Sequence, residues 1–445
     1  MNRQKKLLLL VGVLAALCVV IAIVTGVQKH IDTVTTVDEE IVAADPEALT
    51  AVSWTKEGAT LSFTQADGTW QDASDAAFPV DQEKMADFLS HFESVHASFI
   101  IENVEDFAQY GLDDPGCTIT LTSADGDTVL ELGDFSTMDE KRYVTLGDGT
   151  VYLIDDDLAG YAVTDRDELM RQDVIPGYDT LDGIVATGET AFTVEHRPDE
   201  ELCYTDAYEY YLNDGGSYEP LDSGKVEGLV DTLNALDRSD YATYTADEAS
   251  LAGYGLDAPA LTFTVTTTLD GTQESHALAF GQDGDGNHYL RMDDSPIVYR
   301  VDADAYADDV AAAGYDTLRP DEVLALNWDT VESIDFTIDD SVYTAVKSGD
   351  TWTINDSEVE FGDVQDAIDG LTVNTFNDET ADKKQEIAFT VHLDSEAFPE
   401  VSVAVYQYDG ENCLVQLDGV TLGLAARSLA VDLTEAVNAI TLGLA

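Results

Sequence analysis

The chain has 445 residues, of which 44% are hydrophobic, and it carries 89 Asp plus Glu against 20 Lys plus Arg, a formal net charge of −69. So acidic a surface repels phosphate backbones, which excludes nucleic-acid binding. The hydrophobic share excludes a disordered acidic tail, and the length indicates about three domains.

The first element in chain order is an uncharged apolar run, Leu7 to Val27. At about 1.5 Å per residue it is about 30 Å long as a helix, which matches a bilayer core. Arg3, Lys5 and Lys6 precede the run, so the positive-inside rule places the N-terminus in the cytoplasm. We therefore predict a single-pass protein of the cell membrane with an extracellular C-terminal part.

The predicted N-terminal organisation is a cytoplasmic stub at 1–6, a transmembrane helix at 7–27 and a polar stalk at 28–45. A cleaved signal peptide is the alternative, but Val24-Thr25-Gly26 is a poor small-x-small cleavage site. The sequence does not decide whether this segment is cleaved.

Three cysteines follow the apolar run: Cys117, Cys203 and Cys413. An odd number without a Cys-x-x-Cys pair does not make a disulfide framework. At most one bridge can form, and buried thiols are the favoured interpretation, with any pairing left open.

The rest of the chain consists of three stretches with one pattern. Each begins with alternating apolar residues and a Gly-containing turn, which is the signal of a β-hairpin. An aromatic residue follows the turn each time: Trp70, Tyr218 and Trp352. An amphipathic helix comes next. Its apolar positions are Met85, Phe88, Leu89, Phe92 and Val95 in the first stretch, Val226, Leu229, Val230, Leu233 and Leu236 in the second, and Val364, Ala367, Ile368 and Leu371 in the third.

A repeated string, Tyr-Gly-Leu-Asp-x-Pro, follows the first two helices. Glycine permits a positive φ, and proline favours extended backbone before it, so the string predicts a fixed corner that leads into a strand. The residues of this structural motif are Tyr110, Gly111, Leu112, Pro115, Tyr254, Gly255, Leu256 and Pro259. The third stretch has Asn374 to Gln385 in its place. We interpret Tyr110 and Tyr254 as packed corner residues rather than as a site.

The expected fold class is α+β: three tandem units, each an antiparallel β-sheet with one main amphipathic helix, after the N-terminal transmembrane helix. The predicted units occupy residues 46–175, 176–318 and 319–445.

The order of these motifs resembles the DUF4340 family of bacterial envelope proteins. The residues that carry the resemblance are Trp54, Asp67-Gly68-Thr69-Trp70, Tyr110 to Pro115, Leu132-Gly133-Asp134, Tyr143-Val144 and Val151-Tyr152. The second unit resembles the family more weakly, and the third does so only by pattern. The resemblance implies an exported, anchored ectodomain without an established biochemical activity, associated with ABC transport systems. It therefore implies an ABC transporter permease or another envelope protein as partner, and it transfers no catalytic residue.

A search for chemistry finds no nucleophile elbow, no His-Glu-x-x-His and no phosphate-binding loop, so we predict no enzyme, no catalytic residue and no cofactor. Asp283, Asp285 and Asn287 are weak metal candidates because their spacing resembles the start of a calcium loop. His288 stands where that loop needs Gly, and Asp294 where it needs Glu, so a hairpin turn is favoured.

A tyrosine-rich stretch could form a stacking platform for a sugar, although tyrosines are also typical of strands. Its members are Tyr204, Tyr208, Tyr210, Tyr211 and Tyr218. The leading hypothesis is an extracytoplasmic binding or assembly module. The alternatives are capture of a cell-wall glycan or a cation, and a carboxylate-based hydrolase.

Overall fold

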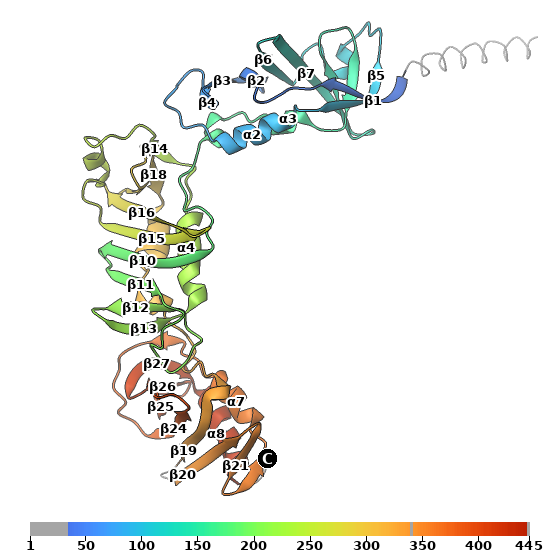
Figure 1. Cartoon of the computed structure of the whole chain (residues 1–445). Coiled ribbons are helices and arrows are strands. Elements are labelled where there is room, and N and C mark those ends of the chain that lie inside the picture. Colours follow the sequence, from blue (N-terminus) through green and yellow to red (C-terminus); the bar gives the residue numbers. More distant parts are fainter. Residues whose placement is uncertain (1–33, 339–340, 443–445) are drawn as a thin grey trace, which may run out of the picture. The chain divides into compact units, whose positions relative to one another are not determined.

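The computed structural model describes residues 34–338 and 341–442 (Figure 1). The predicted stub at 1–6, the predicted membrane helix at 7–27 and the beginning of the predicted stalk lie outside these residues. Among the described helices, none has both the length and the apolar character needed to cross a membrane. The chain folds into two compact units, one ending at Gln172 and the other running from Asp173 to Ala445.

The first unit contains one antiparallel sheet of nine strands, in the order β1-β5-β9-β8-β7-β6-β2-β3-β4. The strands are β1 (Val34–Val42), β2 (Leu49–Lys56), β3 (Ala59–Ala66), β4 (Thr69–Asp72), β5 (Val95–Ile101), β6 (Cys117–Ser123), β7 (Gly126–Ser136), β8 (Lys141–Thr145) and β9 (Val151–Ile154). The helices are α2 (Gln82–Ser90) and α3 (Leu158–Tyr161), with 3-10 turns η1 (Ala108–Tyr110) and η2 (Arg166–Leu169). Strand β1 comes from the predicted stalk and pairs with β5 at the edge of the sheet.

The second unit contains two such sheets. The one nearer the N-terminus has the order β13-β12-β11-β10-β15-β16-β17-β18-β14. Its strands are β10 (Thr180–Gly188), β11 (Phe192–His196), β12 (Tyr210–Asp214), β13 (Ser217–Leu221), β14 (Tyr241–Thr243), β15 (Leu261–Leu269), β16 (Thr272–Gln282), β17 (His288–Met292) and β18 (Val298–Val301). Its helices are α4 (Ser223–Ala235), α5 (Ala303–Ala305) and α6 (Tyr315–Leu318), with the 3-10 turn η3 (Leu251–Tyr254) and the π-helical turn η4 (Tyr306–Ala311).

The third sheet has the order β22-β21-β20-β19-β24-β25-β26-β27-β23. Its strands are β19 (Val331–Ile338), β20 (Ser341–Ser348), β21 (Thr351–Ile354), β22 (Ser357–Val359), β23 (Thr375–Phe376), β24 (Gln385–Leu393), β25 (Glu400–Gln407), β26 (Asn412–Leu417) and β27 (Val420–Ala426). The helices are α7 (Gly362–Asp369) and α8 (Arg427–Thr441), and the 3-10 turn η5 (Trp328–Thr330) precedes β19.

All three sheets share a central strand order, and the first differs at its ends: it has three hairpin strands instead of four, and β1 lies outside β5. A run of hairpin strands (β2–β4, β10–β13 or β19–β22) precedes the helix, and a four-strand meander ends the unit. The one strand between the helix and the meander (β5, β14 or β23) pairs with the last strand of that meander. The first hairpin strand pairs with the first meander strand, and a bulge near the start of the hairpin strand shifts the register at the same place each time: after Leu49, Leu181 and Val331. A bulge is a specific device that re-aims a strand, so its recurrence confirms tandem β-rich units of common design.

Strand alternation explains how each sheet forms its core. Along β15, Leu261, Phe263 and Val265 are buried while the threonines between them face outwards. Strand β6 does the same with Cys117 and Ile119. Each buried aliphatic or aromatic side chain contributes about 1.5–3 kcal/mol, and the amphipathic helix covers the apolar face.

Helices α2 and α4 begin at acidic caps, and one sequence expectation needs correction. Asp81 accepts hydrogen bonds from two amides of the first turn of α2, at 3.0 and 3.1 Å. In α4 the cap is Asp222, whose carboxylate accepts the Lys225 amide at 2.8 Å. Helix α2 ends at Ser90, so Val95, which fits the helical spacing, lies in strand β5 instead.

The third sheet departs from the expectation of one main helix. Helix α7 buries Val364 and Ile368, and the longer α8 adds Leu433 and Val437 to the same hydrophobic core. The coarser prediction, tandem antiparallel sheets with few helices, is confirmed.

Arg238 is a buried charged residue beyond the end of α4, and its exposed fraction is 2%. Its guanidinium donates hydrogen bonds to the carbonyls of Leu233 at 2.9 Å, Asn234 at 2.7 Å and Leu236 at 3.0 Å. The last carbonyls of a helix have no partner within the helix and carry the negative end of its dipole. Arg238 therefore closes this end of α4, although burial lowers its pKa.

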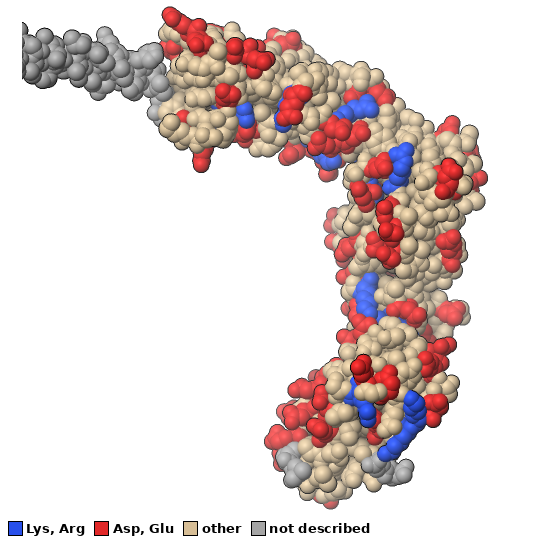
Figure 2. Space-filling model, turned by 180° about the vertical axis from the view of Figure 1, so that it is seen from behind, with Lys and Arg blue, Asp and Glu red and all other residues tan. Residues whose placement is uncertain are grey.

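Negative charge is spread over the surface rather than confined to one patch. Figure 2 shows Asp and Glu over all parts of the visible face, with Lys and Arg in isolated places. A net charge of −69 repels itself in the compact state.

We expect added NaCl to stabilise the folded chain. Raising the salt from about 0.05 M to about 0.5 M shortens the Debye length well below the size of a domain and screens this repulsion. The midpoint of thermal unfolding is expected to rise by about 5 °C or more. KCl should act equally, since screening does not depend on the cation. A midpoint that stays constant or falls would contradict this account.

Candidate functional site

The repeated Tyr-Gly-Leu string forms the same corner in two of the sheets. Tyr110 ends η1 and Tyr254 ends η3. The glycine that follows is left-handed, with φ of 69° at Gly111 and 67° at Gly255, a conformation that strains residues with a side chain. The string thus turns the chain sharply before the meander.

Each corner is packed against the rest of its sheet. The equivalent contacts are the ring pairs Tyr110–Tyr143 and Tyr254–Tyr289, both with centroids 4.9 Å apart, and the buried side chains of Leu112 and Leu256. Pro115 and Pro259 lie half-buried just before β6 and β15. These contacts make the string a structural corner in both sheets.

A second pair of glycines, Gly133 and Gly281, lets each corner approach its sheet closely. A Cβ on Gly255 would lie 2.3 Å from the Gln282 carbonyl oxygen, and one on Gly281 would lie 2.5 Å from the Tyr254 carbonyl oxygen. In the first sheet a Cβ on Gly133 would lie 2.2 Å from the Tyr110 carbonyl oxygen. In both sheets the Tyr-Gly-Leu string is therefore in direct contact with the strand that contains the second glycine, Gly133 or Gly281.

The weak metal candidates Asp283, Asp285 and Asn287 lie in the turn between β16 and β17. The Asp283 carboxylate accepts both the backbone and the side-chain amide of Asn287, at 3.0 and 2.9 Å, and the Tyr289 hydroxyl at 2.9 Å. The Asn287 hydrogen bonds lower the pKa of Asp283. The carboxylate thus organises its own turn. Among the described residues, no three His, Cys, Asp or Glu side chains are placed to hold a metal ion.

The three cysteines are free thiols. Cys117 and Cys413 are buried, and burial raises the pKa of Cys117 and raises that of Cys413 to about 11. Cys203 is partly exposed and donates to the Thr205 carbonyl at 3.2 Å. Two of the three cysteines, Cys117 and Cys413, are therefore buried, unreactive thiols.

Within the second unit, a long connection between β11 and β12 links the second sheet to the third. We call residues 197–209 the strap. Tyr204 of the strap packs against the hydrophobic core of the third sheet, and its hydroxyl accepts the Ala325 amide at 3.2 Å. Glu201 accepts the Ser395 hydroxyl at 2.8 Å. The strap is therefore held by both sheets.

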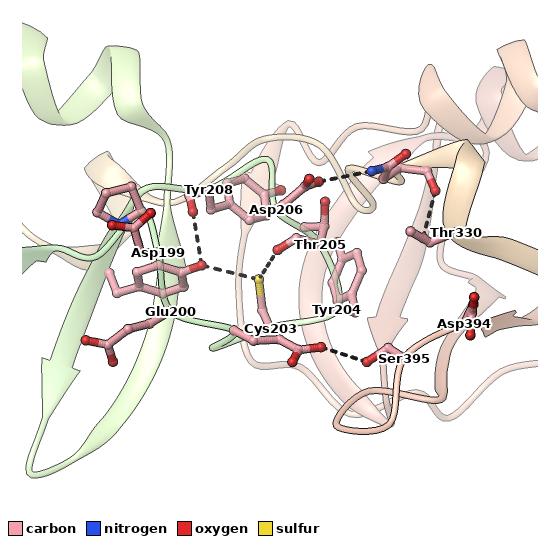
Figure 3. Close-up of a pocket in the computed structure, with 14 residues that line it drawn as sticks. Asp199, Glu200, Cys203, Tyr204, Thr205, Asp206, Tyr208, Thr330, Asp394 and Ser395 are labelled. Atoms are coloured by element: carbon pink, nitrogen blue, oxygen red, sulfur yellow. Dashed lines mark hydrogen bonds between the residues drawn. The ribbon is translucent and has the colours of Figure 1, made fainter.

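A cleft of about 310 Å³, which we call the junction cleft, opens between the strap and the start of the third sheet (Figure 3). Residues of both sheets line it: Pro198, Asp199, Glu200, Glu201, Cys203, Tyr204, Thr205, Asp206, Tyr208, Tyr211, Asn327, Thr330, Asp394 and Ser395. Asn327 donates to Asp206 at 3.4 Å across it. Ligand sites of about 300–1,000 Å³ commonly lie between domains.

The inner wall of the cleft is aromatic and uncharged. Tyr211 donates to the Tyr208 carbonyl at 3.0 Å, and its hydroxyl lies 3.6 Å from the Cys203 sulfur. Burial raises the pKa of Tyr204 to about 12 and raises the pKa of Tyr208 and of Tyr211 well above the usual value. All three phenols are neutral at physiological pH.

The predicted tyrosine platform does not form as one surface. Tyr210 is buried in the second sheet, and the rings of Tyr211 and Tyr218 meet at 90°. The structure instead brings Tyr204, Tyr208 and Tyr211 to the junction cleft.

A charged cluster holds the beginning of the strap. Glu195 accepts the Asn213 side chain and Arg197, both at 2.6 Å, and Arg197 also pairs with Glu200 of the cleft at 2.5 Å. The hydrogen bond from Asn213, together with Arg197, lowers the pKa of Glu195.

This shift predicts a pH dependence for Glu195→Gln. A lowered folded-state pKa stabilises the fold above the unfolded value of about 4, and the gain is lost as the pH falls through the lower folded value. The free energy of unfolding of the wild type should therefore exceed that of the variant by about 1 kcal/mol or less at pH ~6. This difference should disappear towards pH ~3. Urea unfolding at both pH values measures it. A gap that does not change with pH would show that Glu195 acts without its charge.

No pattern in the sequence indicates the junction cleft. Its acidic residues are unremarkable in a chain with 89 Asp plus Glu, and Asn327, Thr330, Asp394 and Ser395 belong to no motif. Only the tyrosines of the strap stood out, as an unusual cluster of aromatic residues.

A family model described as "Domain of unknown function (DUF4340)" matches residues 70–184 and 215–389, which together are more than half of the chain. The first match begins in β4 and ends in β10, the first strand of the second sheet. The second match begins in the turn between β12 and β13 and ends in β24 of the third sheet. The second match thus crosses the connection between the second and third sheets. No curated protein matches the chain.

Proposed function

Because the chain belongs to the DUF4340 family, we propose that it is a membrane-anchored extracytoplasmic binding or assembly module, an accessory component of an ABC-type transport system in the cell envelope. The anchor is the apolar segment at 7–27, with the N-terminus in the cytoplasm. The permease of the transporter, or another envelope protein, is its partner.

The observation that carries this proposal is the repetition of one sheet topology, with the second and third sheets joined by direct contacts. Lys225 of α4 donates to Asp321 at 2.7 Å and to the Arg319 carbonyl at 3.0 Å, and the Arg319 guanidinium lies 3.6 Å from the ring centroid of Phe376. Arrays of repeated units present extended surfaces and typically bind partners rather than catalyse reactions. The acidic surface repels anionic lipid headgroups, which keeps the folded part away from the bilayer.

The test is purification of the tagged full chain from detergent-solubilised membranes. We expect a permease or ATPase subunit to co-purify with it. The matched control carries residues 1–45 fused to an unrelated soluble domain, so it retains the apolar segment and lacks the sheets. Recovery of the full chain alone, or of the same partners with the control, would contradict the proposal.

The junction cleft favours a second function, ligand capture in the envelope, with a cell-wall glycan or a cation as ligand. It combines aromatic side chains with carboxylates in a concave site, as binding proteins do. Thermal unfolding of the full chain with wall fragments or with calcium tests this role. An unchanged midpoint across such a panel would remove it.

A further inference from the structure

We propose that the junction cleft binds a small aliphatic amine, a ligand with ammonium groups on a flexible carbon chain. The proposal rests on the ligand-capture role given above and names its ligand class. It uses three features of the cleft: its fixed walls, its charge and its aromatic interior.

The walls of the cleft are held in place before any ligand arrives. Tyr204 is anchored in the third sheet, Glu201 is bonded to Ser395, and Arg197 ties Glu200 to the second sheet through Glu195. A site that is already ordered loses little conformational entropy on binding.

The rim of the cleft carries carboxylates and no cation. Five acidic side chains line it: Asp199, Glu200, Glu201, Asp206 and Asp394. No Lys, Arg or His is among the lining residues, and across the described chain only Arg197 forms an ion pair with any of the five, through Glu200. A concave surface lined by one sign of charge concentrates ligands of the opposite sign.

The interior suits a carbon chain that carries such a charge. Tyr204 and the Cys203 thiol are half-buried and offer apolar and aromatic contact to methylene groups, and an aromatic ring attracts an ammonium group. The Thr205 and Ser395 side chains line the same space and can accept its N–H groups. An aliphatic amine therefore matches both the rim and the interior.

The other two ligand classes fit this site less well. A divalent metal needs several oxygen ligands converging on one point, and no group of three such side chains is so placed in the described part of the chain. A neutral sugar gains no charge attraction from the five rim carboxylates.

Calorimetric titration of the full chain in detergent micelles with spermidine, at about 150 mM NaCl, tests the proposal. We expect one saturable site per chain. The double variant Asp199→Asn/Asp394→Asn should weaken it about tenfold or more, because it removes two rim carboxylates that pair with no cation of the described chain. Equal thermal unfolding of variant and wild type verifies the fold.

A chain this acidic also attracts polyamines diffusely, so the matched control removes the same charge elsewhere. Glu358→Gln/Glu360→Gln changes two exposed acids beside and within β22, outside the cleft lining, and should leave the site unchanged. Equal weakening by both double variants, or no saturable spermidine binding, would overturn the proposal.

A third arm uses N,N′-diacetylchitobiose, a neutral disaccharide. Suppose that the disaccharide binds, that the cleft variant abolishes this binding and that spermidine does not bind. The ligand-capture role is then supported, and the amine is the wrong ligand class. Purification of envelope partners is a separate readout, so failure of the amine proposal does not affect the assembly role.

Discussion

Replacing Gly255 by Ala is expected to destabilise the second sheet by about 2–5 kcal/mol. Its φ of 67° lies in the left-handed region, which costs a residue with a Cβ about 1–2 kcal/mol. The new Cβ would also lie 2.3 Å from the carbonyl oxygen and 2.8 Å from the amide nitrogen of Gln282, and relief of such overpacking costs about 1–3 kcal/mol more. Both atoms are backbone atoms, so the strand itself must shift.

Urea unfolding of the full chain measures this loss, and the same 3-10 turn supplies the control. A Cβ on Gly253 meets nothing within 4 Å, and the residue has no positive φ, so Gly253→Ala should change the free energy of unfolding by less than about 0.5 kcal/mol. If the two variants unfold alike, the corner tolerates a side chain and is not the fixed structural element described above.

The hairpins could be predicted because their determinants are local. The turn at Asp67-Gly68 has φ of 52° and 80°, a conformation that favours this pair of residues, and alternating apolar residues flank it. The corner string was visible for the same reason, since one glycine and one proline fix its backbone. The contact of this string with Gly133 or Gly281 could not be predicted, because only the folded structure brings these two parts of the chain together.

The sequence did not predict the strand that follows the helix in each sheet and pairs with the last meander strand. Strand β23 is only Thr375–Phe376, too short to show alternation, and Val95 at the start of β5 continues the helical spacing of α2. Pairing with β27 or β9 defines these strands, and that pairing is set by tertiary structure. Strand β1, in the segment predicted as a stalk, is defined in the same way by β5.

The junction cleft could not be predicted from the sequence at all. Tyr204 and Ala325 are 121 residues apart, and nothing local indicates that the strap reaches the third sheet. The tyrosines form an unusual cluster in the sequence, but their roles in the structure differ. Tyr204 anchors the strap, Tyr210 fills the core of its sheet and Tyr211 lines the cleft. Residue type alone does not separate these roles.

Removing the Arg238 side chain is expected to cost about 3 kcal/mol or more. Arg238→Ala leaves the carbonyls of Leu233, Asn234 and Leu236 without their donor, and each buried, unpaired polar group costs about 1–3 kcal/mol. Arg238→Lys should recover part of this loss, because one ammonium group cannot reach all three carbonyls at once. The α4 end should open first, which hydrogen exchange of its amides would show.

Arg300→Ala is the matched control, since it removes the same charge from the same sheet. Arg300 is about half exposed and pairs with Asp240 at 2.6 Å, so its loss should cost about 1 kcal/mol or less. Arg300 also donates to the Tyr241 carbonyl at 2.8 Å, but in an exposed place. A large difference between the two arginine variants in urea unfolding would therefore show that burial of the contacts, rather than charge in an acidic chain, explains the effect. If Arg300→Ala proved as costly as Arg238→Ala, the scarcity of cations in this chain would be the determinant, and each remaining Lys or Arg would matter to stability wherever it lies.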